Sequence, residues 1–127
     1  MPSVFLEHAN ITVRDPKRQA EKLCDLFDWK IRWDGAAKSN GYTVHVGDEH
    51  SYLALWEPVT LVDNGREKEE IKGHLNHVGV VVSDLDAIEA RIKKAGYETY
   101  SHADYEPGKR FYFDFNENLE IEVVSYS

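Results

Sequence analysis

The stretch LEHANITVRD at residues 6–15 decides how this chain folds, because LNHVGVVVSD at residues 75–84 repeats it. Both the histidines, His8 and His77, and the closing aspartates are 69 residues apart (77 − 8 and 84 − 15). Each stretch is rich in β-branched and other apolar residues, which predicts a strand. The chain is therefore expected to contain two copies of one structural unit.

Each repeated stretch leads into a predicted helix. The closing aspartate is a favoured N-cap residue, and in the first copy a proline follows it at the first helical position. In the second copy, apolar residues at spacings of three and four over residues 85–95 form one face of a helix, and Gly96 is placed to end it. Short strands separated by turn residues follow each helix, at residues 30–33, 42–46 and 52–56 in the first half and 97–100, 110–113 and 119–124 in the second.

These elements predict an α+β fold built from two βαβββ modules, at about residues 4–60 and 74–126, within a single domain of residues 1–127. The segment DNGREKEE at residues 63–70 has dense charge and no periodicity, and we interpret it as a linker between the modules. One module alone is too small to bury a sufficient core. Two modules side by side are expected to form a curved mixed sheet around a cavity.

Composition restricts the partners. The chain has 127 residues, a formal net charge of −8 and one cysteine. The negative charge disfavours nucleic acid and anionic membranes as partners, and no apolar run approaches the ~20 residues of a transmembrane helix. A single cysteine excludes an internal disulfide framework, and the first residues show no signal-peptide pattern. We expect a cytoplasmic protein that acts on a small molecule.

The repeated histidines carry the chemical signal. Two equivalent strands can direct His8 and His77 to a common point, where two imidazoles form half of a divalent-metal site that a carboxylate usually completes. The alternative is that each histidine is hydrogen-bonded within the fold. On the last predicted strand, the period of two places Glu120 and Glu122 on one face, opposite its apolar residues. This face is either the cavity side or a solvated surface.

The repeated strand–helix openings, the βαβββ order and the closing stretch FYFD at residues 111–114 resemble the vicinal oxygen chelate superfamily. This superfamily contains glyoxalases, bleomycin resistance proteins and extradiol dioxygenases. The resemblance implies that His8, His77 and a carboxylate of the last strand bind one divalent metal ion, which could be Zn, Ni, Mn or Fe.

The resemblance does not choose the carboxylate by spacing alone. In the family it lies seven residues after an aspartate, and here seven residues after Asp114 is the apolar Ile121. One extra residue in the turn at 116–118 makes Glu122 the ligand, which is our preferred assignment, whereas a shorter count makes it Glu120. The other glutamate is then a candidate catalytic base. The fourth ligand of glyoxalase I falls on Ala54, which cannot bind a metal, so three protein ligands are expected.

The resemblance also suggests how a substrate is bound. On the penultimate strand Phe111 and Lys109 share a face that is expected to line the pocket, and His45 of the first module is a further candidate. The function this implies is that of a metal-dependent lyase, isomerase or thiol transferase. The alternatives are an Fe(II) extradiol dioxygenase and a metal-free binding protein of the bleomycin resistance type. Family members lead us to expect a homodimer.

Overall fold

A computed structural model describes residues 4–37, 40–62, 72–105, 108–116 and 119–127. The chain divides into two compact units, Met1–Asp63 and Asn64–Ser127. Each contains one of the expected modules. The predicted linker at 63–70 lies outside the described residues.

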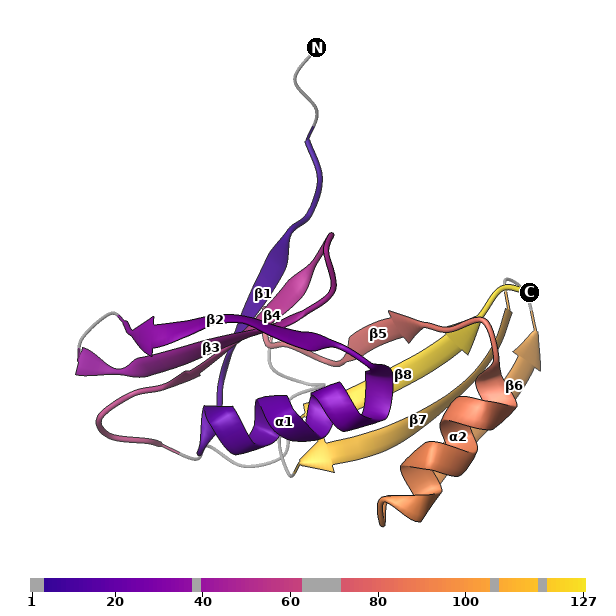
Figure 1. The fold of residues 1–127 in the computed structure, drawn as a ribbon. Helices are drawn as coiled ribbons and strands as arrows, with labels where there is room; N and C mark the ends of the chain where they lie inside the picture. The colour runs from indigo at the N-terminus through magenta and orange to yellow at the C-terminus, as the bar shows by residue number, and fades with distance from the viewer. Residues whose placement is uncertain (1–3, 38–39, 63–71, 106–107, 117–118) are drawn as a thin grey trace. The chain divides into compact units, whose positions relative to one another are not determined.

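The first unit is a four-stranded mixed sheet with one helix (Figure 1). Along the chain its elements are β1 (His8–Thr12), α1 (Pro16–Phe27), β2 (Lys30–Ala36), β3 (Tyr42–Gly47) and β4 (Tyr52–Glu57). The spatial order is β1-β4-β3-β2, in which β1 is parallel to β4 and the other pairs are antiparallel.

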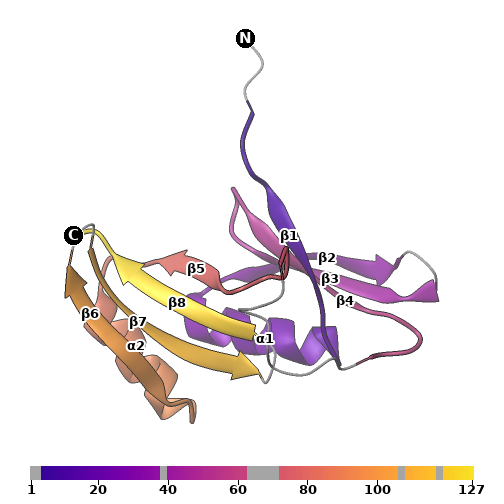
Figure 2. The ribbon, with the colours of Figure 1, turned by 180° about the vertical axis from the view of Figure 1, so that it is seen from behind.

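The second unit has the same topology (Figure 2). Its elements are β5 (Val78–Val81), α2 (Leu85–Lys94), β6 (Thr99–Tyr105), β7 (Gly108–Asn116) and β8 (Leu119–Ser125), in the spatial order β5-β8-β7-β6. Again the first strand is parallel to the last. The predicted α+β fold with two βαβββ modules is therefore confirmed.

The strand registers show which residues are equivalent in the two units. Asn10 of β1 is opposite Ala54 of β4, and Gly79 of β5 is opposite Glu122 of β8. Asn10 and Gly79 are 69 residues apart (79 − 10), which is the repeat distance. Ala54 therefore occupies the place in the first unit that Glu122 occupies in the second.

One face of each sheet carries the apolar core. In the first unit α1 packs mainly on β3, and its fully buried Leu23 accompanies Val44, Val46 and Leu55 of the sheet. In the second unit Ile92 of α2 and the inward residues of β7 and β8 are equally buried; those strand residues are Phe111, Phe113, Ile121 and Val123. The opposite face of each sheet is left to the polar and aromatic residues of the candidate site.

The structure corrects several sequence-based boundaries. β2 and β7 are longer than predicted, and residues 34–35, expected to end a strand, lie within β2. β6 begins at Thr99 rather than residue 97. Asp84 caps α2 as expected, because its side chain accepts a 3.0 Å hydrogen bond from the backbone N–H of Ala87. Asp15 instead adopts a left-handed conformation with φ of 53° and makes no capping hydrogen bond through its side chain.

Gly96 has a φ of 104° immediately after the C-cap residue of α2, as expected for a glycine that ends a helix. Within the described ranges, no helix is both long and apolar enough to span a membrane.

Candidate functional site

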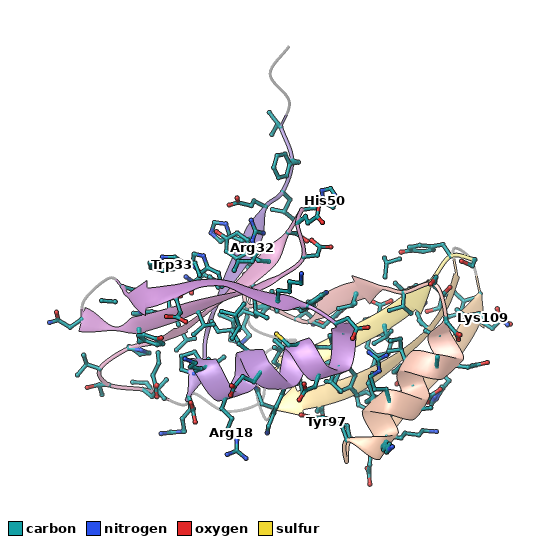
Figure 3. All side chains as sticks on the ribbon, in the orientation of Figure 1. Arg18, Arg32, Trp33, His50, Tyr97 and Lys109 are labelled. Carbon is teal, nitrogen blue, oxygen red and sulfur yellow. The ribbon has the colours of Figure 1, made fainter. Side chains whose placement is uncertain are left out.

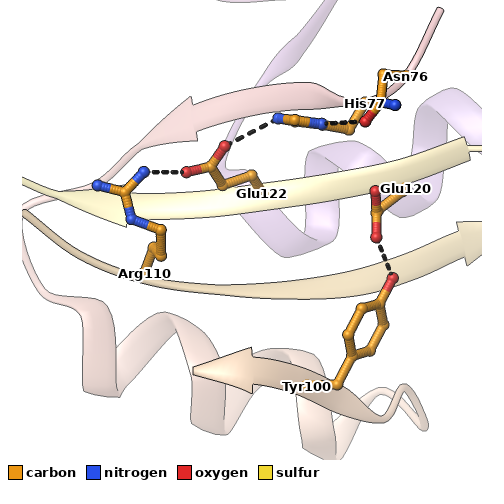
Figure 4. A network of polar contacts seen from close by, with 6 residues as sticks. All are labelled: Asn76, His77, Tyr100, Arg110, Glu120 and Glu122. Carbon is orange, nitrogen blue, oxygen red and sulfur yellow. Dashed lines mark hydrogen bonds and ion pairs between the residues drawn. The ribbon is translucent and has the colours of Figure 1, made fainter. Parts of the chain in front are cut away.

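His77 and Glu122 are in direct contact in the second unit. His77 immediately precedes β5, and Glu122 lies on the adjacent, parallel strand β8. Nε2 of His77 is 2.9 Å from Oε1 of Glu122 (Figure 4). Of the two glutamates considered from the sequence, Glu122 is therefore the one that contacts His77.

The neighbouring residue orients the His77 ring. Nδ1 of His77 lies 2.8 Å from Oδ1 of Asn76, which accepts a hydrogen bond when Nδ1 carries the proton. In that tautomer of the neutral ring the lone pair is on Nε2. Two atoms with lone pairs, Nε2 and Oε1 of Glu122, then face each other. Either a second proton or a metal ion between them satisfies both atoms.

Arg110 holds the other oxygen of Glu122. Its Nη1 donates to Oε2 at 2.7 Å, and each of the two side chains is only 12% exposed. Nη2 of Arg110 donates to the backbone carbonyl of Gly108, and the guanidinium lies 5.2 Å from the centre of the Tyr105 ring. The carboxylate of Glu122 is thus fixed between a cation and an imidazole (Figure 4).

Glu120 belongs to a second polar cluster. The hydroxyl group of Tyr100 lies 2.6 Å from Oε2 of Glu120 and 2.7 Å from Oδ1 of Asp114. Burial raises the pKa of Tyr100, and the two carboxylates raise it further. The hydroxyl therefore keeps its proton at neutral pH and holds Glu120 through a hydrogen bond.

The hairpin of β7 and β8 contains a bulge in β7. Asp114 is opposite Glu120, but Asn116 is opposite Leu119, so the register shifts by one residue at Phe115. The extra residue expected in the turn at 116–118 lies partly outside the described residues, and it stays a prediction.

The face assigned to β7 from the sequence was wrong. Phe111 is opposite Val123 and has no exposed surface, so it belongs to the core rather than to the face of Glu122. Tyr112 and Arg110 occupy the face of Glu122 instead, because residues directly opposite on neighbouring strands point to the same side. Lys109 lies near the start of β7, and its side chain is 63% exposed (Figure 3). Its Nζ is 3.9 Å from Oδ2 of Asp104.

His8 of the first unit is arranged like His77. Its Nδ1 donates to Oε1 of the preceding residue, Glu7, at 3.0 Å, which leaves Nε2 for another partner. This hydrogen bond is the main reason why the pKa of Glu7 is lowered. The His8 ring stacks on Tyr52 of β4 with centroids 4.8 Å apart, so its orientation is fixed from two sides.

Tyr52 also contacts residues of β3 and β2. Its ring stacks on His45 with centroids 4.6 Å apart, and Arg32 lies 4.5 Å from its ring centre. A bulge between Ile31 and Trp33 inserts Arg32 into β2. As a result Arg32 and Trp33 both lie on the side of the sheet away from α1 (Figure 3).

A pocket of about 370 Å³ lies on this side of the first sheet. It is lined by Asn10, Ala37, Thr43, His45 and Trp56. His45, expected from the sequence to contact a substrate, thus lies at a pocket. Burial lowers the pKa of His45, and the charges of His8 and Arg32 lower it further.

The structure therefore brings together two of the three predicted ligands, His77 and Glu122. His8 belongs to the other unit, and its place beside them stays a prediction. In the part of the chain that the structure describes, no group of three or more His, Cys, Asp or Glu side chains is arranged to hold a metal ion.

Several residues of this arrangement escaped the sequence reasoning. Glu7 and Asn76 orient the two histidines, Arg110 holds Glu122, and Tyr100 holds Glu120. For the first two a signal was present, because each has a side-chain oxygen and directly precedes a repeated histidine. The other two contacts depend on cross-strand register, which the sequence does not show.

Paired βαβββ modules with a histidine at the opening of each define the class of fold. The chain belongs to the Glyoxalase/Bleomycin resistance protein/Dioxygenase superfamily, whose family profile matches residues 7–113. No curated protein matches the sequence closely enough to add to this assignment.

Solved structures share the fold at low sequence identity. A glyoxylase/bleomycin resistance protein/dioxygenase domain from Frankia sp. EAN1pec is 22% identical, with 98% of each chain covered and a TM-score of 0.79. The fosfomycin resistance protein FosX from Listeria monocytogenes, complexed with Mn(II) and 1S,2S-dihydroxypropylphosphonic acid, is 20% identical over 98% of this chain and 93% of that one, with a TM-score of 0.70. TnmS3, an antibiotic binding protein from Streptomyces sp. CB03234, is 16% identical over 100% and 99%, with a TM-score of 0.72. At these identities the likeness shows the fold alone.

Proposed function

We propose that this protein is a divalent-metal-dependent enzyme of the superfamily, with His8, His77 and Glu122 as the metal ligands. Its reaction is of the lyase, isomerase or thiol-transferase type, on a small substrate with two adjacent oxygen atoms. The observation that carries the proposal is the contact between Nε2 of His77 and Oε1 of Glu122.

The separation of these two atoms suits a shared metal ion. Bonds from a metal to imidazole nitrogen and carboxylate oxygen are about 2.0–2.2 Å long. Two such bonds at the right angle of an octahedral site would place the ligand atoms about 2.9 Å apart, whereas the tetrahedral angle typical of zinc would place them about 3.4 Å apart. Nε2 of His77 and Oε1 of Glu122 are 2.9 Å apart. A metal can therefore replace the proton between them with little movement of either side chain.

Hydrogen bonds to the far side of each ligand also support the proposal. Metal-binding histidines usually donate their other N–H to an oxygen atom that fixes the ring. His77 donates to Asn76, and His8 donates to Glu7 in the same way. Arg110 occupies Oε2 of Glu122, which leaves Oε1 directed at His77.

When bound, a divalent ion at this site would supply Lewis acidity to two adjacent substrate oxygens. The protein's own groups have separate tasks. Arg110 orients the Glu122 carboxylate through a hydrogen bond, and Tyr100 holds Glu120 on the same face of the sheet. Glu120 is the candidate base for a substrate proton.

The same contact between Arg110 and Glu122 favours a second candidate, a metal-free small-molecule-binding protein. A guanidinium at 2.7 Å already balances the charge of the Glu122 carboxylate. TnmS3, which shares the fold, is described as an antibiotic binding protein.

Metal content decides between the two. The purified protein is loaded separately with Mn(II), Zn(II), Ni(II) and Fe(II) and measured by elemental mass spectrometry. We expect about one ion per chain, lost in His8→Ala, His77→Ala and Glu122→Gln but kept in His50→Ala, a histidine at an exposed turn. Selective binding of iron would favour a dioxygenase. No ion in the parent, or equal binding in all variants, would exclude the proposed site.

A further inference from the structure

We infer that the pocket on the first unit's sheet binds an uncharged, planar aromatic ring of the substrate. The inference rests on the proposed function, in that it names the substrate class of that site. It is carried by the side chains that line the pocket.

The pocket lies on a sheet face whose middle residue is small and uncharged. Asn10, Ala54 and His45 lie side by side across β1, β4 and β3. Their middle member, Ala54, is buried and is the counterpart of Glu122, so the first unit has a methyl group where the second unit has its carboxylate. Asn10 and His45, on either side of it, line the pocket.

The pocket has aromatic lining residues and few polar groups. Trp56 contributes an indole ring and His45 an imidazole ring that also contacts Tyr52 and Trp33, and aromatic rings of this kind favour a planar partner over a rounded one. The amide of Asn10 and the hydroxyl of Thr43 supply hydrogen-bonding groups at the edge. Because the Thr43 hydroxyl already donates to the carbonyl of Leu55, it is left to accept a hydrogen bond from a ligand.

The lining also selects for a ligand without charge. Of the five lining residues, only His45 can carry a charge. Its lowered pKa, caused first by burial, keeps it neutral at physiological pH. A charged group entering this pocket would lose its hydration without gaining an ionic partner, which costs free energy. A volume of about 370 Å³ is at the small end for ligand pockets and suits one or two fused rings.

The pocket is connected to a proposed metal ligand through stacked rings. His45 stacks on Tyr52, and Tyr52 stacks on His8. A ring bound against His45 is therefore connected to His8 through two stacked side chains, His45 itself and Tyr52. This arrangement suits a substrate whose aromatic part is held in the pocket and whose oxygens are presented toward His8.

The test uses three probes of one size on metal-free protein in the presence of a chelator. These are 2-naphthol, which is flat and uncharged at pH 7, its fully saturated analogue decahydro-2-naphthol, and the anion 2-naphthoate. Binding is measured by isothermal titration calorimetry. We expect 2-naphthol to bind at least about fivefold more tightly than either of the others. Equal binding of the saturated analogue, or tighter binding of the anion, would overturn the inference.

Variants then locate the binding. Ala54→Leu adds a bulky side chain between Asn10 and His45, on the sheet face that carries the pocket, and should weaken 2-naphthol binding at least about tenfold. Ala90→Leu, the same change at an exposed position of α2, should leave it unchanged. Trp56→Phe keeps a flat wall and should keep most of the affinity, while Trp56→Leu should lose it. If circular dichroism shows that Ala54→Leu does not fold, the comparison of Trp56→Phe with Trp56→Leu still tests whether 2-naphthol binds in this pocket. Unchanged affinity in both Ala54→Leu and Trp56→Leu would contradict the assignment to this pocket.

This test is independent of the metal test. If the protein binds a metal but not 2-naphthol, the inferred substrate class is wrong and the metal site stands. If it binds 2-naphthol in this pocket but no metal, the pocket stands and the proposed enzyme does not.

Discussion

The contact between Arg110 and Glu122 allows a quantitative prediction about the second unit. Nη1 of Arg110 lies 2.7 Å from Oε2 of Glu122, and both side chains are 12% exposed. Two unit charges about 4 Å apart attract by about 4 kcal/mol at an effective dielectric constant of about 20. Loss of hydration by both groups offsets part of this attraction. We therefore expect a net coupling free energy of about 2 kcal/mol.

A double-mutant cycle measures this coupling. The variants are Arg110→Met, Glu122→Gln and the two combined, each unfolded in urea at pH 7. Far-ultraviolet circular dichroism is the suitable signal, because the three tryptophans, at positions 29, 33 and 56, all belong to the first unit. Each single change should lower the free energy of unfolding by about 2–3 kcal/mol, since it leaves a poorly hydrated charge without its partner.

The double variant should lose about 2 kcal/mol less free energy of unfolding than the sum of the two single losses. Arg110→Lys serves as a matched control. It keeps the charge but cannot bond both Glu122 and the Gly108 carbonyl through one planar fork, so we expect partial recovery. Single effects that add to within about 0.5 kcal/mol would refute the reasoning, because independent residues behave in that way.

Two further predictions concern single residues. Because burial lowers the pKa of His45, the folded protein resists its protonation, so His45 should cost stability as the pH falls below the ordinary imidazole pKa of about 6.5 and cost nothing above it. Urea midpoints between pH 7.5 and 5 should accordingly fall less steeply in His45→Gln than in the parent or in His50→Gln, and identical slopes would contradict this. Phe111→Ala should lower the free energy of unfolding by about 3–5 kcal/mol, because the ring has no exposed surface. Lys109→Ala on the same strand should change it by less than about 0.5 kcal/mol, and a small loss for Phe111→Ala would return this residue to the candidate binding face.

The repeat of residues 6–15 at residues 75–84 was sufficient to predict the fold. Strand and helix signals are local, because they depend on the alternation and spacing of apolar residues within a few turns of chain. Two copies of the same local pattern fold into the same module, so the strand order is identical in both units. The repeat also placed His8 and His77 at equivalent positions, at or beside the first strand of each unit.

The sequence could not assign the faces of β7 or choose between the two glutamates. A period of two shows that Phe111 and Arg110 point to opposite sides, but not which side is the core. It also places Glu120 and Glu122 on the same side without separating them. The pairings of β8 with β7 and with β5 place Arg110 on the face of Glu122 and bring Glu122 into contact with His77, since they set which residues lie opposite each other. Which glutamate binds a metal stays a prediction.

What the sequence by itself determined is thus the set of elements, their order and the positions of the histidines. What only the tertiary structure decided is the set of contacts, in which Glu122 contacts His77 and Arg110, Glu120 contacts Tyr100, and Asn10, His45 and Trp56 line one pocket. The physical reason is the distance along the chain between the residues involved. Periodicity is a property of neighbouring residues, whereas these contacts join strands distant in sequence, whose register is fixed only when the sheet is assembled.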